Sequence, residues 1–263
     1  MDSSDQKRIV IKIGTHVLTQ DDGVDLHHAR IAGLTHAIAD LNKAGHECLV
    51  VSSGAVGAGL ATFQLDARPE DIGMLQACAA AGQARLMHVY ESQFSNYSLK
   101  VAQLLVTHED LNADDRRVNV HTTLTRLLDF PKVIPIINEN DSVAVYELKV
   151  GDNDLLSADI ARLIDADQLI MLTSVPGLRR PDSDDPNDIV TEVEDIETVL
   201  DFADGESGRL SVGGMATKLQ AVKNAVDAGI ETVIASGRNP DQLSDLVSGG
   251  GIGTRFRPRV LLA

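Results

Sequence analysis

The sequence offers little material for covalent cross-links or membrane insertion. Its 263 residues include 2 cysteines and no tryptophan, and aromatic residues make up 3% of the chain. Two cysteines cannot build a disulfide framework or a four-cysteine metal site, which favours a reducing compartment. No apolar run approaches the ~18 residues of a membrane span, and the polar N-terminal segment has no signal-peptide core. We therefore expect a cytoplasmic protein without a membrane partner.

Positive charge is scarce as well. Lysine and arginine total 23 against 39 aspartates and glutamates, so the formal net charge is −16. Nucleic-acid binding depends on a cationic surface, so this balance argues against a nucleic-acid partner.

Several well-known catalytic motifs are missing from the sequence. No Gly-Lys pair occurs, which excludes a Walker A loop, and no G-x-G-x-x-G follows the first apolar run. The His-Arg-Asp and Asp-Phe-Gly motifs of protein kinases are absent, as is the G-x-S-x-G elbow of many hydrolases. Without H-E-x-x-H, the eight histidines give no zinc-protease pattern. We expect no metal site formed by the protein.

Short apolar runs alternate with segments of helical periodicity along the chain. Runs of this kind predict strands at residues 9–14, 47–52, 101–106, 133–137, 168–173 and 232–235. Helical spacing predicts helices at residues 26–44, 69–97, 114–128, 154–164 and 215–228, and residues 143–150 could form a hairpin arm. This alternation is typical of an α/β fold, with a mainly parallel sheet buried on both faces. No linker divides the chain, so we expect one domain with two lobes.

Five loops at the ends of predicted strands carry small or charged residues. They read KIGT from Lys12, SSGAVGAG from Ser52, NEND from Asn138, GDNDLLS from Gly151 and GGMATK from Gly213. Each loop has an ordinary structural interpretation as a tight turn, a helix cap or a solvated surface. Ligands of such folds nevertheless bind beyond the carboxyl ends of the strands, where these loops would meet.

Together the loops supply two lysines, amide-rich glycine turns and a group of carboxylates and amides. Lys12 stands inside an apolar strand, which is costly unless it meets an anion. Lys218 stands in the first turn of a helix, where it opposes the helix dipole. These groups suit the transfer of a phosphoryl group to an anionic acceptor, a reaction that depends mainly on positioning and charge neutralisation.

In their order, the motifs KIGT, SSGAVGAG, PIINENDSVAVYELKVGDND, MLTS and GGMATK resemble those of the glutamate 5-kinase family within the amino-acid kinase superfamily. The similarity extends from about Ile9 to Arg257. It implies a three-layer αβα sandwich in which residues 1–165 hold glutamate and residues 166–263 hold the nucleotide. It also implies ATP-dependent phosphorylation of the γ-carboxylate of L-glutamate, the first step of proline biosynthesis.

The resemblance assigns roles to individual residues. Lys12 and Lys218 would bracket the phosphoryl group, with Asp154 holding both lysines in place. Glutamate would contact Ser53, Asp141 and Asn153, the hydroxyl and the amide binding its carboxylates and Asp141 its α-ammonium. The remaining nucleotide contacts would come from Gly14, Gly54, Thr173, Ser174, Gly213, Gly214, Met215 and again Lys218, the first two through their backbone. Mg²⁺ would be held mainly by the ATP phosphates.

Some positions depart from the family pattern. Ser174 stands where an aspartate is usual and Val212 where a threonine is usual, which leaves the nucleotide preference open. Bacterial members often carry a C-terminal PUA domain, for which this chain is too short. The family further implies a homo-oligomer and feedback inhibition by proline. Two alternatives are a related kinase with another acceptor and a non-catalytic amino-acid sensor.

Overall fold

One eight-stranded sheet forms the centre of the computed structural model, which describes residues 6–144, 153–206 and 214–258. Its strand order is β3-β4-β2-β1-β5-β7-β8-β6, and neighbouring strands are parallel except for β7 and β8. The strands are β1 (Arg8–Ile13), β2 (Glu47–Ser52), β3 (Lys100–Val106), β4 (Val133–Glu139), β5 (Gln168–Thr173), β6 (Glu192–Val193), β7 (Glu231–Ser236) and β8 (Gly253–Phe256).

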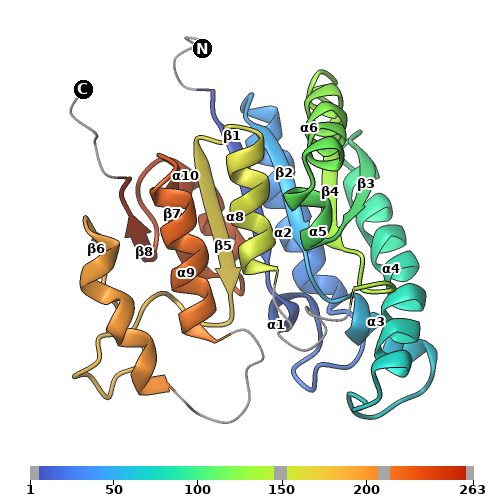
Figure 1. The fold of residues 1–263 in the computed structure, drawn as a ribbon, viewed down its shortest axis with the longest axis horizontal. Coiled ribbons are helices and arrows are strands. Elements are labelled where there is room, and N and C mark those ends of the chain that lie inside the picture. The colour runs from blue at the N-terminus through green and yellow to red at the C-terminus, as the bar shows by residue number, and fades with distance from the viewer. Residues whose placement is uncertain (1–5, 145–152, 207–213, 259–263) are drawn as a thin grey trace.

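Helices cover both faces of this sheet, which gives three layers (Figure 1). One face packs against α2 (His28–Lys43), α4 (Ile72–Ser95) and α10 (Leu243–Val247), and the other against α6 (Asp114–Leu128), α8 (Asp154–Leu163) and α9 (Met215–Val226). Shorter elements are α1 (Thr15–Leu18), α3 (Ala55–Thr62), α5 (His108–Asn112) and the 3₁₀ helices η1 (Ile196–Glu206) and η2 (Pro240–Gln242). Within the described residues, no helix is both long and apolar enough to span a membrane.

The alternation of side chains along β1 decides which layer each residue faces. Ile9, Ile11 and Ile13 belong to the apolar cluster beneath α2 and α4, whereas Val10 belongs to the cluster beneath α8 and α9. Since successive side chains of a strand point to opposite faces, Lys12 shares the face of Val10. The lysine is thereby directed towards the layer that contains α8 and α9.

Helices α3 and α4 pack with their backbones in close contact. A Cβ atom on Gly59 would lie 1.9 Å from the carbonyl oxygen of Cys78, and one on Gly82 would lie 1.8 Å from that of Ala55. Only glycine fits at either position. This contact fixes the start of α3, which follows the end of β2, against the middle of α4.

The mainly parallel α/β fold predicted from the sequence is confirmed. The bounds of β2, β5 and α6 are those predicted, and the other predicted strands and helices differ by a few residues at their ends. Strand β8, the single antiparallel neighbour among the described strands, was not predicted. Most of the predicted hairpin arm at residues 143–150 lies outside the described residues.

Candidate active site

Three charged residues from separate parts of the chain meet beyond the carboxyl ends of the central strands. Lys12 lies near the end of β1, Asp154 is the first residue of α8, and Lys218 lies in the first turn of α9. The Asp154 carboxylate bridges the two lysines, with Oδ1 2.7 Å from Lys12 Nζ and Oδ2 3.0 Å from Lys218 Nζ. The structure thus brings together the three residues to which the resemblance assigns catalytic roles.

Burial makes this arrangement energetically demanding. The exposed fractions are 1% for Lys12, 0% for Asp154 and 9% for Lys218. A single carboxylate lies between the two ammonium groups. Asp154 is favoured at the N-terminus of α8, whereas Lys218 is disfavoured at that of α9. A buried cation in an unfavourable position indicates that the site is built to receive an anion.

Two glycines follow the ends of β1 and β2, and Gly14 lies beside the cluster. Gly54 adopts φ +91°, a conformation that favours glycine, where the chain turns from β2 into α3. A Cβ atom on Gly14 would lie 3.7 Å from Lys12 Nζ, so the missing side chain leaves space beside the ammonium group. The Gly14 N–H donates to the carbonyl oxygen of Leu172 at 3.0 Å. This N–H is therefore engaged in the sheet, and the expected backbone contact from Gly14 to phosphate stays a prediction.

A chain of buried side-chain amides leads away from Asp154 towards α4. Asn153 Nδ2 donates to Asn138 Oδ1 at 2.6 Å and to the Ser52 carbonyl oxygen at 2.5 Å. Asn138 Nδ2 then donates to Gln83 Oε1 at 2.8 Å. All three amide side chains are at least nine-tenths buried. This network joins β2, β4, α4 and the start of α8.

The polarity of this network changes the expected role of Asn153. Both hydrogens of its amide nitrogen are used by Ser52 and Asn138, so the group left for a ligand is the oxygen Oδ1. An amide oxygen accepts hydrogen bonds, as an ammonium group requires, and does not bind a carboxylate. This geometry favours Asn153 as an acceptor from the substrate over Asn153 as a donor to its carboxylates, and its contact with glutamate stays a prediction.

Ser53 and Asp141, the other residues predicted to bind glutamate, lie on neighbouring loops. Ser53 follows β2 and is buried, and its hydroxyl oxygen has no hydrogen-bond partner among the described residues. Asp141 lines a pocket of about 310 Å³ between α4, β3 and the loop after β4. Gln83, Glu139 and Asn140 line the same pocket. It combines amides and acids, the groups that match an amino acid.

The residues predicted to contact the nucleotide lie at the ends of β5 and α9. Thr173 ends β5 and is buried, and the exposed Ser174 follows it. Gly214 caps the start of α9, and Met215 is the first residue of this helix, three positions before Lys218. Gly213 lies outside the described residues.

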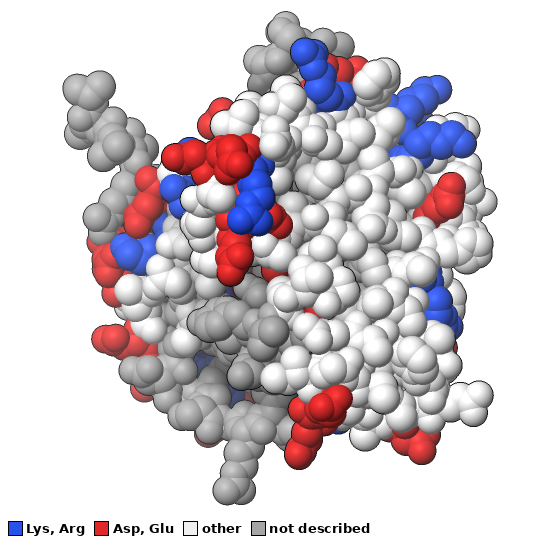
Figure 2. Space-filling model, turned by 45° about the vertical axis from the view of Figure 1, so that its right-hand side comes forward, with Lys and Arg blue, Asp and Glu red and all other residues white. Residues whose placement is uncertain are grey.

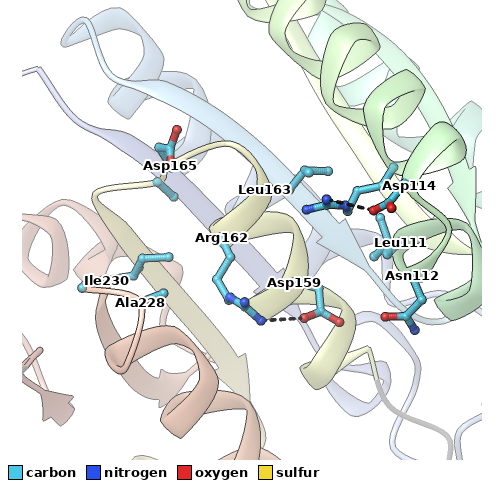
Figure 3. A pocket seen from close by; sticks show the side chains of 12 residues that line it. Leu111, Asn112, Asp114, Asp159, Arg162, Leu163, Asp165, Ala228 and Ile230 are labelled. Atoms are coloured by element: carbon cyan, nitrogen blue, oxygen red, sulfur yellow. Dashed lines mark hydrogen bonds and ion pairs between the residues drawn. The ribbon is translucent and has the colours of Figure 1, made fainter.

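A larger pocket of about 500 Å³ lies at the other end of the sheet (Figure 3). Its lining includes Asp165 and Ala166, which precede β5, and Ile230, which precedes β7. Arg162 and Asp159 pair across 3.6 Å on its wall. Both of its arginines are about half exposed and paired with aspartates, so the size of this pocket does not identify it as the site of the chemistry.

Gln83 and the Ser52–Tyr90 contact were not predicted from the sequence. Ser52 Oγ lies 2.9 Å from the hydroxyl of Tyr90, a fully buried residue of α4 whose pKa is raised by burial. Gln83 follows Gly82 in an alanine-rich helix, where no motif marks it. The one available signal was the glycine, which permits close packing at that point of α4.

Comparison with known proteins supports the fold first. The chain resembles a carbamate kinase from Giardia lamblia, solved with AMP-PNP, with a TM-score of 0.64 at 17% identity, covering 97% of this chain and 99% of that one. At this level of identity the likeness shows a shared fold.

Sequence relatives give a narrower result. A glutamate 5-kinase from Herpetosiphon aurantiacus is 45% identical over 98% of this chain and 70% of its own length. One from Clostridium acetobutylicum is 42% identical over 97% of this chain and 96% of its own length. The model of the amino acid kinase family matches residues 7–236. The chain therefore belongs to the amino acid kinase family and, within it, to the glutamate 5-kinases.

Proposed function

We propose that this protein transfers the γ-phosphoryl group of ATP to the γ-carboxylate of L-glutamate, giving L-glutamate 5-phosphate, the first step of proline biosynthesis. The observation that carries the proposal is the buried bridge of Lys12, Asp154 and Lys218. Two anions must approach each other in this reaction, and two lysines on one carboxylate supply the positive charge that offsets their repulsion. We infer that the acceptor is glutamate because the sequence relatives are named glutamate 5-kinases.

The two lysines and the aspartate of the bridge have different roles. Lys12 and Lys218 stabilise the charge on the transferring phosphoryl group, and electrostatic stabilisation of this kind often contributes most to the rate enhancement of an enzyme. Asp154 is a positioning residue, because a carboxylate nucleophile has no proton for it to remove. With both of its oxygens on lysines, it is not arranged as a metal ligand. Mg²⁺ fits best on the phosphates of ATP, where it neutralises negative charge.

One domain of two parts would perform this reaction. Residues 1–165 contribute Ser53, Asp141 and Asn153 to the glutamate site. Residues 166–263 contribute the nucleotide site, with Thr173, Ser174, Gly213, Gly214, Met215 and Lys218, and Gly14 and Gly54 border it from the first part. The position of the amino-acid pocket beside α4, away from α9, supports this division.

The test is a Mg²⁺-ATP assay with hydroxylamine, which traps an acyl phosphate as the hydroxamate. Glutamate, aspartate and N-acetylglutamate are compared as acceptors. Lys218→Ala is expected to lower kcat by about 10²–10³-fold, the usual cost of a lost transition-state contact. Lys223→Ala is the matched control, because this lysine lies on the same helix and pairs with Glu197 and Asp227 near the surface. Hydroxamate from another acceptor, or none from any, would refute the assignment.

Proline inhibition and self-association belong to the same proposal. A pocket that binds the α-ammonium and α-carboxylate groups of glutamate can bind those of proline, so proline is expected to raise the KM for glutamate. A glutamate saturation curve that proline does not move would contradict this.

For self-association, the side of the molecule that carries β3 and α4 shows a broad, largely uncharged area despite the net charge of −16 (Figure 2). Such a face is suited to contact with a second copy of the chain. Light scattering is expected to give a mass above that of the 28.1 kDa monomer, and a monomer would contradict the proposal.

A further inference from the structure

The side-chain NH₂ group of Gln83 is buried beside the amino-acid pocket, with no hydrogen-bond partner in the described part of the chain. Gln83 as a whole is 8% exposed. The residue also lines the pocket that Glu139, Asn140 and Asp141 share. A buried donor left unsatisfied costs free energy unless a bound molecule accepts from it.

Hydrogen bonds determine which end of this amide is left without a partner. The backbone N–H of Glu139 donates to Asn138 Oδ1 at 2.9 Å, and a backbone N–H can only donate. The other end of the Asn138 side chain is therefore its NH₂ group, which donates to Gln83 at 2.8 Å. The Gln83 atom that accepts this bond must be its oxygen. The group left for a ligand is therefore the NH₂ group, which can only donate hydrogen bonds.

The order of residues along the network indicates which part of the substrate Gln83 meets. Asp154 and the two lysines lie at one end, followed by Asn153, Asn138 and finally Gln83 on α4. A γ-carboxylate placed at the lysines would extend the rest of glutamate towards α4. There the acids Glu139 and Asp141 repel a carboxylate and suit the α-ammonium, whereas the Gln83 NH₂ group suits an acceptor.

We propose that Gln83 Nε2 donates a hydrogen bond to the α-carboxylate of the amino-acid substrate and thereby selects acceptors with a free α-carboxylate. This inference rests on the proposed glutamate kinase activity and adds a specificity-determining residue to it. Asn153 Oδ1 and Asp141 then accept from the α-ammonium group. One hydrogen-bond donor and two acceptors would thus bind the α-carboxylate and the α-ammonium group of the substrate.

The experiment crosses two proteins with two substrates. Wild type and Gln83→Leu are assayed with L-glutamate and with glutamate α-amide, which retains the γ-carboxylate but lacks the α-carboxylate. Loss of a hydrogen bond to a charged group is expected to raise the KM for glutamate about 10–100-fold. The KM for ATP should remain unchanged. The ratio of kcat/KM for glutamate to that for the α-amide should fall by at least about 10-fold in the variant.

A second variant keeps the test valid if Gln83→Leu fails to fold. Gln83→Glu has the same size and can still accept from Asn138, but it places an acceptor where the NH₂ group was. In this variant the ratio of kcat/KM for glutamate to that for the α-amide should fall, because the NH₂ group of the α-amide can donate to the new carboxylate. Gln93→Glu, on the same helix and outside the pocket lining, is the matched control and should keep the wild-type ratio.

Each outcome separates this inference from the proposed function. If wild type makes no hydroxamate from glutamate, the proposed function fails. If wild type is active but Gln83→Leu or Gln83→Glu lowers kcat/KM for both substrates by the same factor, the role of Gln83 is structural and the inference is overturned. An unchanged KM for glutamate in both variants would overturn it as well.

Discussion

Replacing Asp154 with asparagine should unfold the protein at a markedly lower temperature. The change removes the carboxylate between Lys12 and Lys218 while keeping the shape of the side chain. Two buried ammonium groups would then face each other without the carboxylate that bridges them. Breaking a buried ion pair from one side typically costs about 3–5 kcal/mol, against a total stability of about 5–15 kcal/mol for a domain. At roughly 2–4 °C per kcal/mol, the melting temperature should fall by about 6–20 °C.

The assay is thermal unfolding followed by circular dichroism, with Asp227→Asn as the control. Asp227 pairs with Lys223 at 3.2 Å, but both side chains are partly exposed, and such pairs contribute about 0–1 kcal/mol. A sharper test changes Lys218 as well. In the wild type, Lys218→Met removes an ion pair and a buried, dipole-opposed cation together, so its effect on the melting temperature should be small, whereas in the Asp154→Asn background it should raise the melting temperature by relieving the repulsion between the two lysines.

Two results would refute this reasoning. One is an Asp154→Asn protein that melts no lower than Asp227→Asn. The other is a Lys218→Met change that lowers the melting temperature equally in both backgrounds. Either would mean that Asp154 does not hold the lysines by charge.

Three further predictions concern other parts of the molecule. Gly82→Ala should lower stability by at least about 3 kcal/mol in urea titrations, because its Cβ would lie 1.8 Å from a carbonyl oxygen, whereas Gly73→Ala in the same helix should stay within about 1 kcal/mol of wild type. Burial raises the pKa of Asp159, so its ionisation weakens the fold as the pH rises through that pKa. Asp159→Asn should therefore melt higher than wild type at pH 7, and the gain should vanish as the pH falls towards 3.8. Cys48 and Cys78 are fully buried, and burial raises the pKa of Cys48 to about 12, so a thiol reagent at pH 8 should label neither until urea is added; labelling of the native protein would contradict their burial.

The sequence alone was enough to single out the site residues that break a local rule of secondary structure. Lys12 interrupts an apolar strand and Lys218 opposes a helix dipole, so each pointed to an anion without any knowledge of the fold. Strand β8 was missed because its four residues follow a glycine-rich turn and carry no periodic pattern.

Gln83 and the orientation of Asn153 could not have been predicted from the sequence. Both depend on hydrogen bonds between segments that meet only in the folded protein, such as α4 with β4 over a separation of 55 residues. An amide gives no sequence signal of which of its two ends faces a ligand. That choice is made by a single backbone N–H, at Glu139.

The position of Lys12 in the sheet has a consequence for the lifetime of the site. Strand β1 lies between β2 and β5, so its backbone is hydrogen-bonded on both sides and its neighbours are covered by helices. Amide hydrogens of such a strand exchange with solvent only when the whole domain opens. The positive charge that meets the phosphoryl group therefore persists as long as the fold itself. Opening of a peripheral loop to admit a substrate would leave that charge in place.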